Sequence, residues 1–327
     1  MKKMLVVLVA VMMVSGFAGC GKAPTGKPKV AGVVFQEDQF MKLLQLGFRD
    51  AAVKAGFEFY PGNTNGDAAK ESEMLNTYVI QGYKGVAISP ISEEASLKVI
   101  SDAAKKGLLI GISNHRFANA DYITGAFTSD NYELGKATGE VAAKFIQEKL
   151  GGQAKIAVLQ FKSLLPEQSS ARSSGFLDVV KKLPGVEIVA DQDAWLQDKA
   201  ITVAGDIITA KKDLNIIWSA NEGGTIGCTM AVKNADKAGK IFVFGTDASE
   251  QMAQLLRDEA NILQAVTAQD PYAIGVKTME TLAKAIRNED YSDTKGKSVI
   301  VPGIVLSRGE PAKIAAFIAD LKAKMGK

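Results

Sequence analysis

The chain is poor in the residues that form cross-links and metal sites. It contains two cysteines, Cys20 and Cys228, and one histidine, His115, among 327 residues. A disulfide framework and a Cys/His zinc cluster both need more of these side chains. The sequence therefore excludes both, and no metal or cofactor is expected. Cys228 lies among small and apolar residues, which favours a small buried packing residue.

An excess of charge of one sign is also lacking. Lys and Arg number 39 against 36 Asp and Glu, for a formal net charge of +3. A nucleic-acid partner is therefore not expected. Enzyme motifs are missing too, because no G-x-G-x-x-G follows the first apolar run and no G-x-S-x-G occurs. Tyr291 stands where a P-loop ending at Gly296-Lys297-Ser298 would need a glycine. We expect a protein that is not an enzyme.

The first residues have the pattern of an export signal. Lys2 and Lys3 precede an unbroken apolar run, Met4 to Val14, which is too short to span a membrane as a normal helix. Small residues and Cys20 follow, and this end resembles a bacterial lipobox with Phe17 where Leu is usual. We expect a signal over 1–19, lipid on Cys20 and a tether over 20–28. The alternative is a plain signal peptide with a chance cysteine.

Short β-branched runs alternate with longer helical patterns over the rest of the chain. In the first half, strands are predicted at 30–34, 57–60, 85–89 and 108–112. The helices between them end at glycines: Gly56, Gly82 and Gly107. Such alternation predicts parallel βαβ units in a doubly wound α/β sheet.

The same pattern restarts in the second half. Strands are predicted at 154–159, 186–189, 216–218 and 241–244, with helices over 134–150, 169–183, 199–211 and 225–237. The last residues add a strand near 263, a helix over 271–288, a strand over 299–306 and a helix over 312–324. We therefore predict two similar α/β lobes with a cleft between them.

Ligands of open α/β sheets bind beyond the carboxyl ends of the strands. The segments there carry amides, a few carboxylates, one arginine and aromatic side chains. Amides, carboxylates and guanidinium groups suit a ligand covered with hydroxyls, and aromatic faces suit the C–H surface of a sugar ring.

Five motifs in order resemble one family. They are Thr128-Ser129-Asp130-Asn131 with Gly135, Ser170 to Phe176, Ser219-Ala220-Asn221-Glu222, Phe244-Gly245-Thr246-Asp247 and Ala268-Gln269-Asp270-Pro271. The chain thereby resembles, over nearly all of 29–310, the periplasmic sugar-binding proteins of the ribose- and galactose-binding type, relatives of the lac repressor core. The resemblance implies a type I periplasmic binding fold: two lobes joined by a three-crossover hinge.

The resemblance also implies site residues. Arg172 matches an arginine that reaches sugar hydroxyls, and Trp195 matches an aromatic that stacks on the ring. Asn221, Asp247 and Gln269 match the family's amide, carboxylate and hinge amide. Asp38 and Phe40 fall where the family has a polar residue and an aromatic after the first strand. Asn114 and His115 fall where ribose binders carry an Asp-Arg pair.

Several of these residues allow a second interpretation. Arg172 and Asp247 alternatively form an ion pair between the lobes, and Trp195 alternatively belongs to the core. His115 either hydrogen-bonds the ligand or the backbone. Glu37, Glu222 and Arg116 fit solvated positions on the rim of the cleft. Asn114-His115 in place of Asp-Arg points away from ribose itself, toward a hexose, a polyol or a modified sugar.

From the motif order, crossovers are expected near Asp130, Asp270 and Leu306. Lobe one then comprises 29–129 plus 270–305, and lobe two 130–269 plus 306–327. We expect an exported, membrane-anchored monomer that captures a monosaccharide or derivative and delivers it to an ABC permease. The alternatives are a component that presents ligand to a chemoreceptor or sensor kinase, and a binder of a nucleoside or an amine-bearing ligand.

Overall fold

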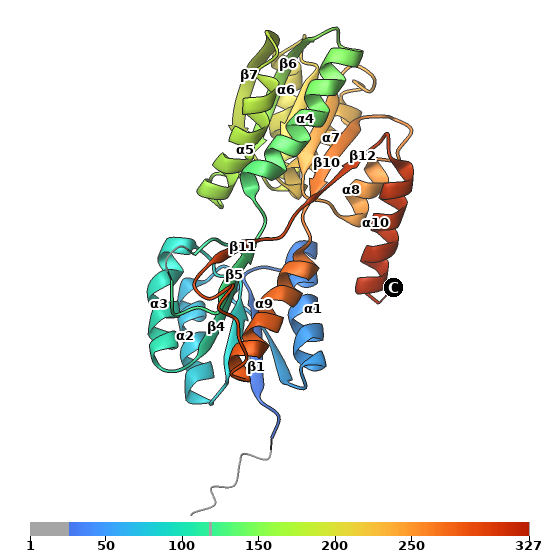
Figure 1. Cartoon of the computed structure of the whole chain (residues 1–327). Helices are drawn as coiled ribbons and strands as arrows, with labels where there is room; N and C mark the ends of the chain where they lie inside the picture. Colours follow the sequence, from blue (N-terminus) through green and yellow to red (C-terminus); the bar gives the residue numbers. More distant parts are fainter. Residues whose placement is uncertain (1–25, 118–119, 327) are drawn as a thin grey trace, which may run out of the picture.

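The computed structural model describes residues 26–117 and 120–326. Within them the chain forms two lobes, each built on a six-stranded sheet (Figure 1). The predicted signal over 1–19, the predicted lipid site at Cys20 and most of the predicted tether over 20–28 lie outside these residues.

The first lobe is a sheet between two layers of helices. Its strands lie in the order β11 (Ser298–Ile300), β5 (Gly125–Thr128), β4 (Leu109–Ser113), β3 (Gly85–Ile88), β1 (Lys29–Val34) and β2 (Glu58–Asn63). All of these pairings are parallel. One face packs against α1 (Gln39–Lys54) and α9 (Pro271–Ile286), and the other against α2 (Ala68–Ile80) and α3 (Glu93–Lys105).

The second lobe repeats this topology. Its strands lie in the order β12 (Ile304–Ser307), β10 (Leu263–Ala268), β9 (Phe242–Thr246), β8 (Ile216–Ser219), β6 (Gln153–Gln160) and β7 (Gly185–Asp193). Only the pairing of β12 is antiparallel among the described strands. The faces carry α4 (Asn131–Lys149) with α5 (Pro166–Val180), and α6 (Gln197–Ala210) with α7 (Glu222–Asn234), α8 (Glu250–Leu255) and α10 (Pro311–Lys324). The predicted pair of doubly wound α/β lobes is confirmed.

Glycines end the helices of the first lobe as expected. Gly56, Gly82 and Gly107 follow α1, α2 and α3 with φ of 79°, 71° and 92°. These left-handed values suit glycine because it has no Cβ. The turn sends each helix back toward the next strand, so the carboxyl ends of the strands all meet at one edge.

The third connection between the lobes lies earlier than expected. The apolar run 299–306 is not one strand, because β11 belongs to the first sheet and β12 to the second. Pro302 and Gly303 separate them. Pro302 has no N–H for a ladder, and a Cβ on Gly303 would lie 2.6 Å from the Leu134 side chain and 2.7 Å from the Ala268 carbonyl oxygen. The crossing thus falls at 301–303, and the expected boundary near Leu306 is wrong by a few residues.

Helices α4 and α5 cross at backbone contact. Gly135 on α4 faces the carbonyl oxygen of Arg172, and Gly175 on α5 faces that of Tyr132. A Cβ at either glycine would overlap the opposite helix. This close crossing fixes the turn of α5 that carries Arg172.

Candidate functional site

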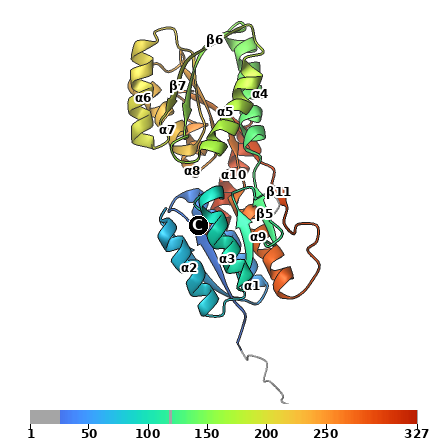
Figure 2. The same cartoon turned by 90° about the vertical axis from the view of Figure 1, so that its left-hand side faces the viewer.

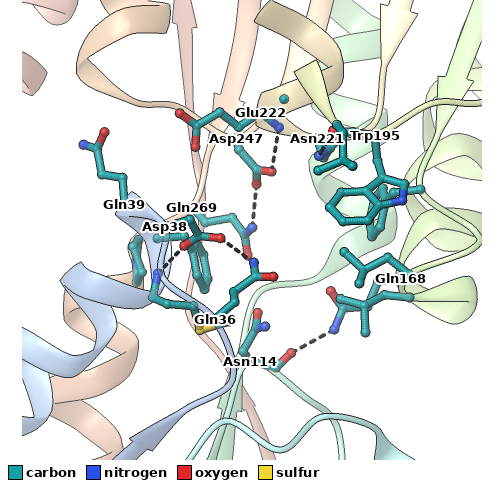
Figure 3. A pocket seen from close by; sticks show the side chains of 18 of the residues that line it. Gln36, Asp38, Gln39, Asn114, Gln168, Trp195, Asn221, Glu222, Asp247 and Gln269 are labelled. Atoms are coloured by element: carbon teal, nitrogen blue, oxygen red, sulfur yellow. Dashed lines mark hydrogen bonds between the residues drawn. The ribbon is translucent and has the colours of Figure 1, made fainter. Parts of the chain in front are cut away.

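A cavity of about 340 Å³ lies between the lobes. The two lobes lie end to end (Figure 2), and side chains from both of them line the cavity beyond the carboxyl ends of the sheets (Figure 3). The volume of the cavity lies within the range of small-molecule sites. Its polar and aromatic lining consists of Gln36, Asp38, Gln39, Asn114, Gln168, Arg172, Gln197, Asn221, Glu222, Asp247, Gln251, Gln269, Phe35, Phe40, Phe161 and Trp195. Eight of the nine predicted ligand contacts are in this set, and His115 is not.

Arg172 is the anchor of the lobe-two wall. Its side chain is 4% exposed. Nη1 lies 3.1 Å and 3.2 Å from the two Asp247 carboxylate oxygens and donates to the Ala220 carbonyl at 2.8 Å. Nε donates to Asn131 Oδ1 at 2.9 Å, and the guanidinium lies over the Phe161 ring. The Arg172–Asp247 ion pair therefore exists, but within one lobe and not between lobes.

Asp247 gathers donors from three elements. Gln269 Nε2 donates to it at 2.7 Å and the Glu222 backbone N–H at 3.2 Å, in addition to Arg172 (Figure 3). Its own φ is 71°, and its N–H donates to the Thr267 carbonyl at 2.9 Å. The carboxylate that follows β9 is thus held in one orientation before any ligand arrives.

Trp195 lines the cavity and also packs against the edge of the lobe-two core. It is half-buried, and its Nε1 donates to the Ser163 hydroxyl at 3.1 Å. Asn221 Nδ2 donates to the Trp195 carbonyl at 3.0 Å, while Asn221 Oδ1 accepts from the Gly224 N–H at 3.3 Å and caps α7. Asn221 therefore positions the Trp195 loop as well as lining the cavity.

The lobe-one wall comes from the segment after β1. Asp38 caps α1 by accepting from the Met41 N–H at 2.7 Å, and it also accepts from the Gln36 side chain. Phe40 is half-buried and packs against the lobe-one core. Both follow the strand next to the point where the order of the sheet reverses, β2-β1-β3, which is where such sheets bind ligands.

Asn114 and His115 have different surroundings. Asn114 lines the cavity with a φ of 63°, and its carbonyl accepts from Gln168 Nε2 at 3.0 Å across the cleft. His115 is 2% exposed, lines a separate depression, and places Nδ1 3.7 Å from Glu93 Oε1. The structure thus places His115 outside the cavity, where it contacts Glu93 instead.

Three carboxylates share the cavity. Burial raises the pKa of Asp38, and Asp247 raises it further. Burial also raises the pKa of Glu222, as do Asp247 and Asp38, while the Ser249 hydroxyl lowers it. The expected rim position of Glu222 is wrong, because its side chain is half-buried and lines the cavity. Its place directly after Asn221, at the end of a buried strand, was the signal available in the sequence.

The described residues hold no group of three or more His, Cys, Asp and Glu side chains suited to a metal ion. Over the same ranges, no helix has both the length and the apolar character that a membrane crossing requires.

Fold and cavity define a two-lobed ligand-binding protein. The family model of the periplasmic binding protein domain matches residues 32–290. The chain is 32% identical to the ABC transporter periplasmic-binding protein YphF of Escherichia coli, over 73% of this chain and 75% of that protein. It is 28% identical to the D-allose-binding periplasmic protein of Escherichia coli, over 74% and 79%.

Solved structures show the same fold. A solute-binding protein from Bacillus halodurans with bound myo-inositol superposes with a TM-score of 0.79 at 16% identity, over 90% of this chain and 99% of that one. The chain belongs to the periplasmic binding protein family. Its members are exported substrate-binding proteins of transport systems and not enzymes, which confirms the prediction that this protein is not an enzyme.

Proposed function

We propose that this protein captures a monosaccharide or a close derivative in the cleft and delivers it to an ABC permease. The observation that supports this most directly is the cavity itself, whose lining combines amides and carboxylates with the half-buried aromatic side chains of Phe40 and Trp195. Such a lining pairs with hydroxyls and covers the C–H face of a ring. Relatives named for D-allose and ribose, and for transport, favour this over presentation to a chemoreceptor.

A thermal-shift screen tests the ligand class. Sugars, polyols, aminosugars and nucleosides are added one at a time to the purified mature protein. A ligand at a hundred times its dissociation constant stabilises the folded state by about 2.7 kcal/mol, which is readily detected. A shift with a nucleoside or an amino acid, and with no sugar or polyol, would contradict the proposal.

We also propose that lipid on Cys20 holds the exported protein on a membrane. The support is the lipobox-like end of the signal together with membership of an exported family. Cys20→Ser should move the protein from the membrane pellet to the soluble fraction. Cys228→Ser is the matched control, because Cys228 is fully buried and should not affect attachment. A Cys20→Ser protein that stays in the pellet after a salt wash would exclude a lipid anchor.

A further inference from the structure

The charges that line the cavity do not balance. Among its lining residues the ionisable ones are Asp38, Glu222 and Asp247 on the acidic side and Arg172 on the basic side. The cavity is a ligand site on the grounds of fold and family, independently of these charges. The excess of acidic side chains therefore indicates which charge the ligand carries.

The one guanidinium is already occupied. Arg172 Nη1 contacts both oxygens of Asp247, and its other bonds go to neutral oxygens. Asp38 and Glu222 form no ion pair with any described residue. Asp38 comes from lobe one and Glu222 from lobe two, so the two unpaired carboxylates approach the same space from opposite walls.

Both carboxylates are held by neutral donors only. Asp38 accepts from the Met41 N–H and the Gln36 amide, and the Ser249 hydroxyl faces Glu222. Burial and the negative charge of Asp247 raise the pKa of each, and Asp38 also raises the pKa of Glu222. The hydroxyls of a neutral ligand could hydrogen-bond both carboxylates, but closing the cleft over such a ligand would still bury two negative charges with no positive charge to balance them, which is costly.

Helix capping does not account for the charges. Asp38 caps α1 and Glu222 begins α7, so each gains from the helix dipole. However, Asn or Ser caps a helix about as well as Asp, and Asn221 already caps α7. A negative charge at both positions therefore calls for a partner in the cavity.

We propose that the ligand is a hydroxylated ring that carries a protonated amino group, an aminosugar or an aminocyclitol, with the ammonium between Asp38 and Glu222. An ammonium has three donors and no acceptor, which matches two carboxylates. The hydroxyls pair with amides such as Gln269 and with Arg172. This inference rests on the proposed function and narrows it to a cationic sugar or polyol.

The test uses ligands matched in all but one group. Calorimetry near pH 7 compares D-glucose, D-glucosamine and N-acetyl-D-glucosamine, then the galactose series, then myo-inositol and its amino-deoxy analogue. The amine should bind about 10-fold or more tightly than the hydroxyl compound of its series, because a charge-assisted bond is lost without it. N-acetylation, which removes the charge, should abolish this preference.

Substitutions of the two carboxylates test whether they cause the preference for the amine. Glu222→Gln and Asp38→Asn should each reduce the preference for the amine several-fold, and Asn keeps the cap of α1. Glu37→Gln is the matched control, because Glu37 is adjacent to Asp38 but lies outside the cavity lining. It should keep the preference intact.

The outcomes separate the two proposals. Neutral sugars or polyols that bind as tightly as their amines would overturn this inference and leave the proposed function in place. An amine preference that survives in both Glu222→Gln and Asp38→Asn would also overturn it. Absence of binding by every sugar and polyol, with or without an amine, would overturn the proposed function and this inference together.

Discussion

Arg172 combines two tasks in one side chain, since it lines the cavity and also neutralises Asp247. We expect Arg172→Ala to lower the free energy of unfolding by about 3 kcal/mol, because it leaves a largely buried carboxylate without its partner. Binding should weaken roughly 10- to 150-fold through the loss of charge-assisted hydrogen bonds. Urea unfolding and calorimetry measure the two effects separately.

The conservative variant at this position sharpens the test. Arg172→Lys keeps the charge but lacks the planar set of donors that reaches Asp247, Ala220 and Asn131 together. It should restore only part of the stability and part of the affinity. A lysine variant equal to wild type in both would show that charge alone matters here.

Glu222 should destabilise the unliganded protein. Its pKa is raised in the folded state, mainly by burial, so the ionised form is disfavoured by folding. The penalty is fully present above the folded-state pKa, shrinks as the pH falls below that value, and is gone below the pKa of the unfolded state. Glu222→Gln without ligand should therefore melt at a higher temperature than wild type at pH 7.5 and lose this advantage at acid pH. Glu37→Gln should show no such gain, and an equal gain there would contradict the argument.

Residue positions in the cavity were largely predictable, but side-chain directions were not. Asp38 and Asp247 follow buried strands, Arg172 lies on the helix after β6, and the carboxyl ends of parallel strands meet at one edge. His115 follows a strand as well, yet it lies outside the cavity while its neighbour Asn114 lines it. The chain leaves the extended conformation at Asn114, whose φ is left-handed, and only Asn114 of the two lines the cavity. No sequence pattern predicts the left-handed φ of Asn114.

At the scale of elements, the crossing of α4 and α5 positions the site. Gly135→Ala should push the two helices apart and displace the turn that carries Arg172. Overpacking of this kind costs about 1–3 kcal/mol, and ligand affinity should fall with it. Thermal melts and calorimetry would show both losses.

Gly205 supplies the matched control for that substitution. It lies within α6, and a Cβ there would meet nothing within 4 Å. Gly205→Ala should be neutral or stabilise the helix by up to about 1 kcal/mol. Equal losses from both alanines would mean that the close crossing is not responsible.

Elements with strong periodicity were predictable, whereas β5, α8 and the division of the run 299–306 were not. Helix α1 has a clear amphipathic pattern and a glycine end, whereas β5 has only four residues and α8 only six. The run 299–306 looked like one strand because its residues are apolar. The division at Pro302 and Gly303 depends on two sheets that the local sequence does not describe.

At the scale of the whole molecule, contacts across the cleft support a closed state. Leu165 packs against hydrophobic clusters of both lobes, and Gln168 donates to the Asn114 carbonyl across the gap. We expect small-angle scattering to show a smaller radius of gyration when ligand is added. Leu165→Ala without ligand should be more extended than wild type, because the bridging contact is lost. Identical profiles for all three samples would exclude a hinge motion.

The hydrogen-bond networks on the two sides of the cavity are unequal, and this has a kinetic consequence. On the lobe-two side Asp247 accepts hydrogen bonds from both Arg172 and Gln269, whereas the side chains of lobe one form a smaller network in which Gln36 donates to Asp38. We expect the ligand to bind first to lobe two, whose side chains are already held in place, and lobe one to close over it afterwards. Changes to lobe one would lengthen or shorten the residence time of the ligand while hardly altering how fast it arrives. Release of the ligand to the next protein in the transport system would then require lobe one to move away from lobe two.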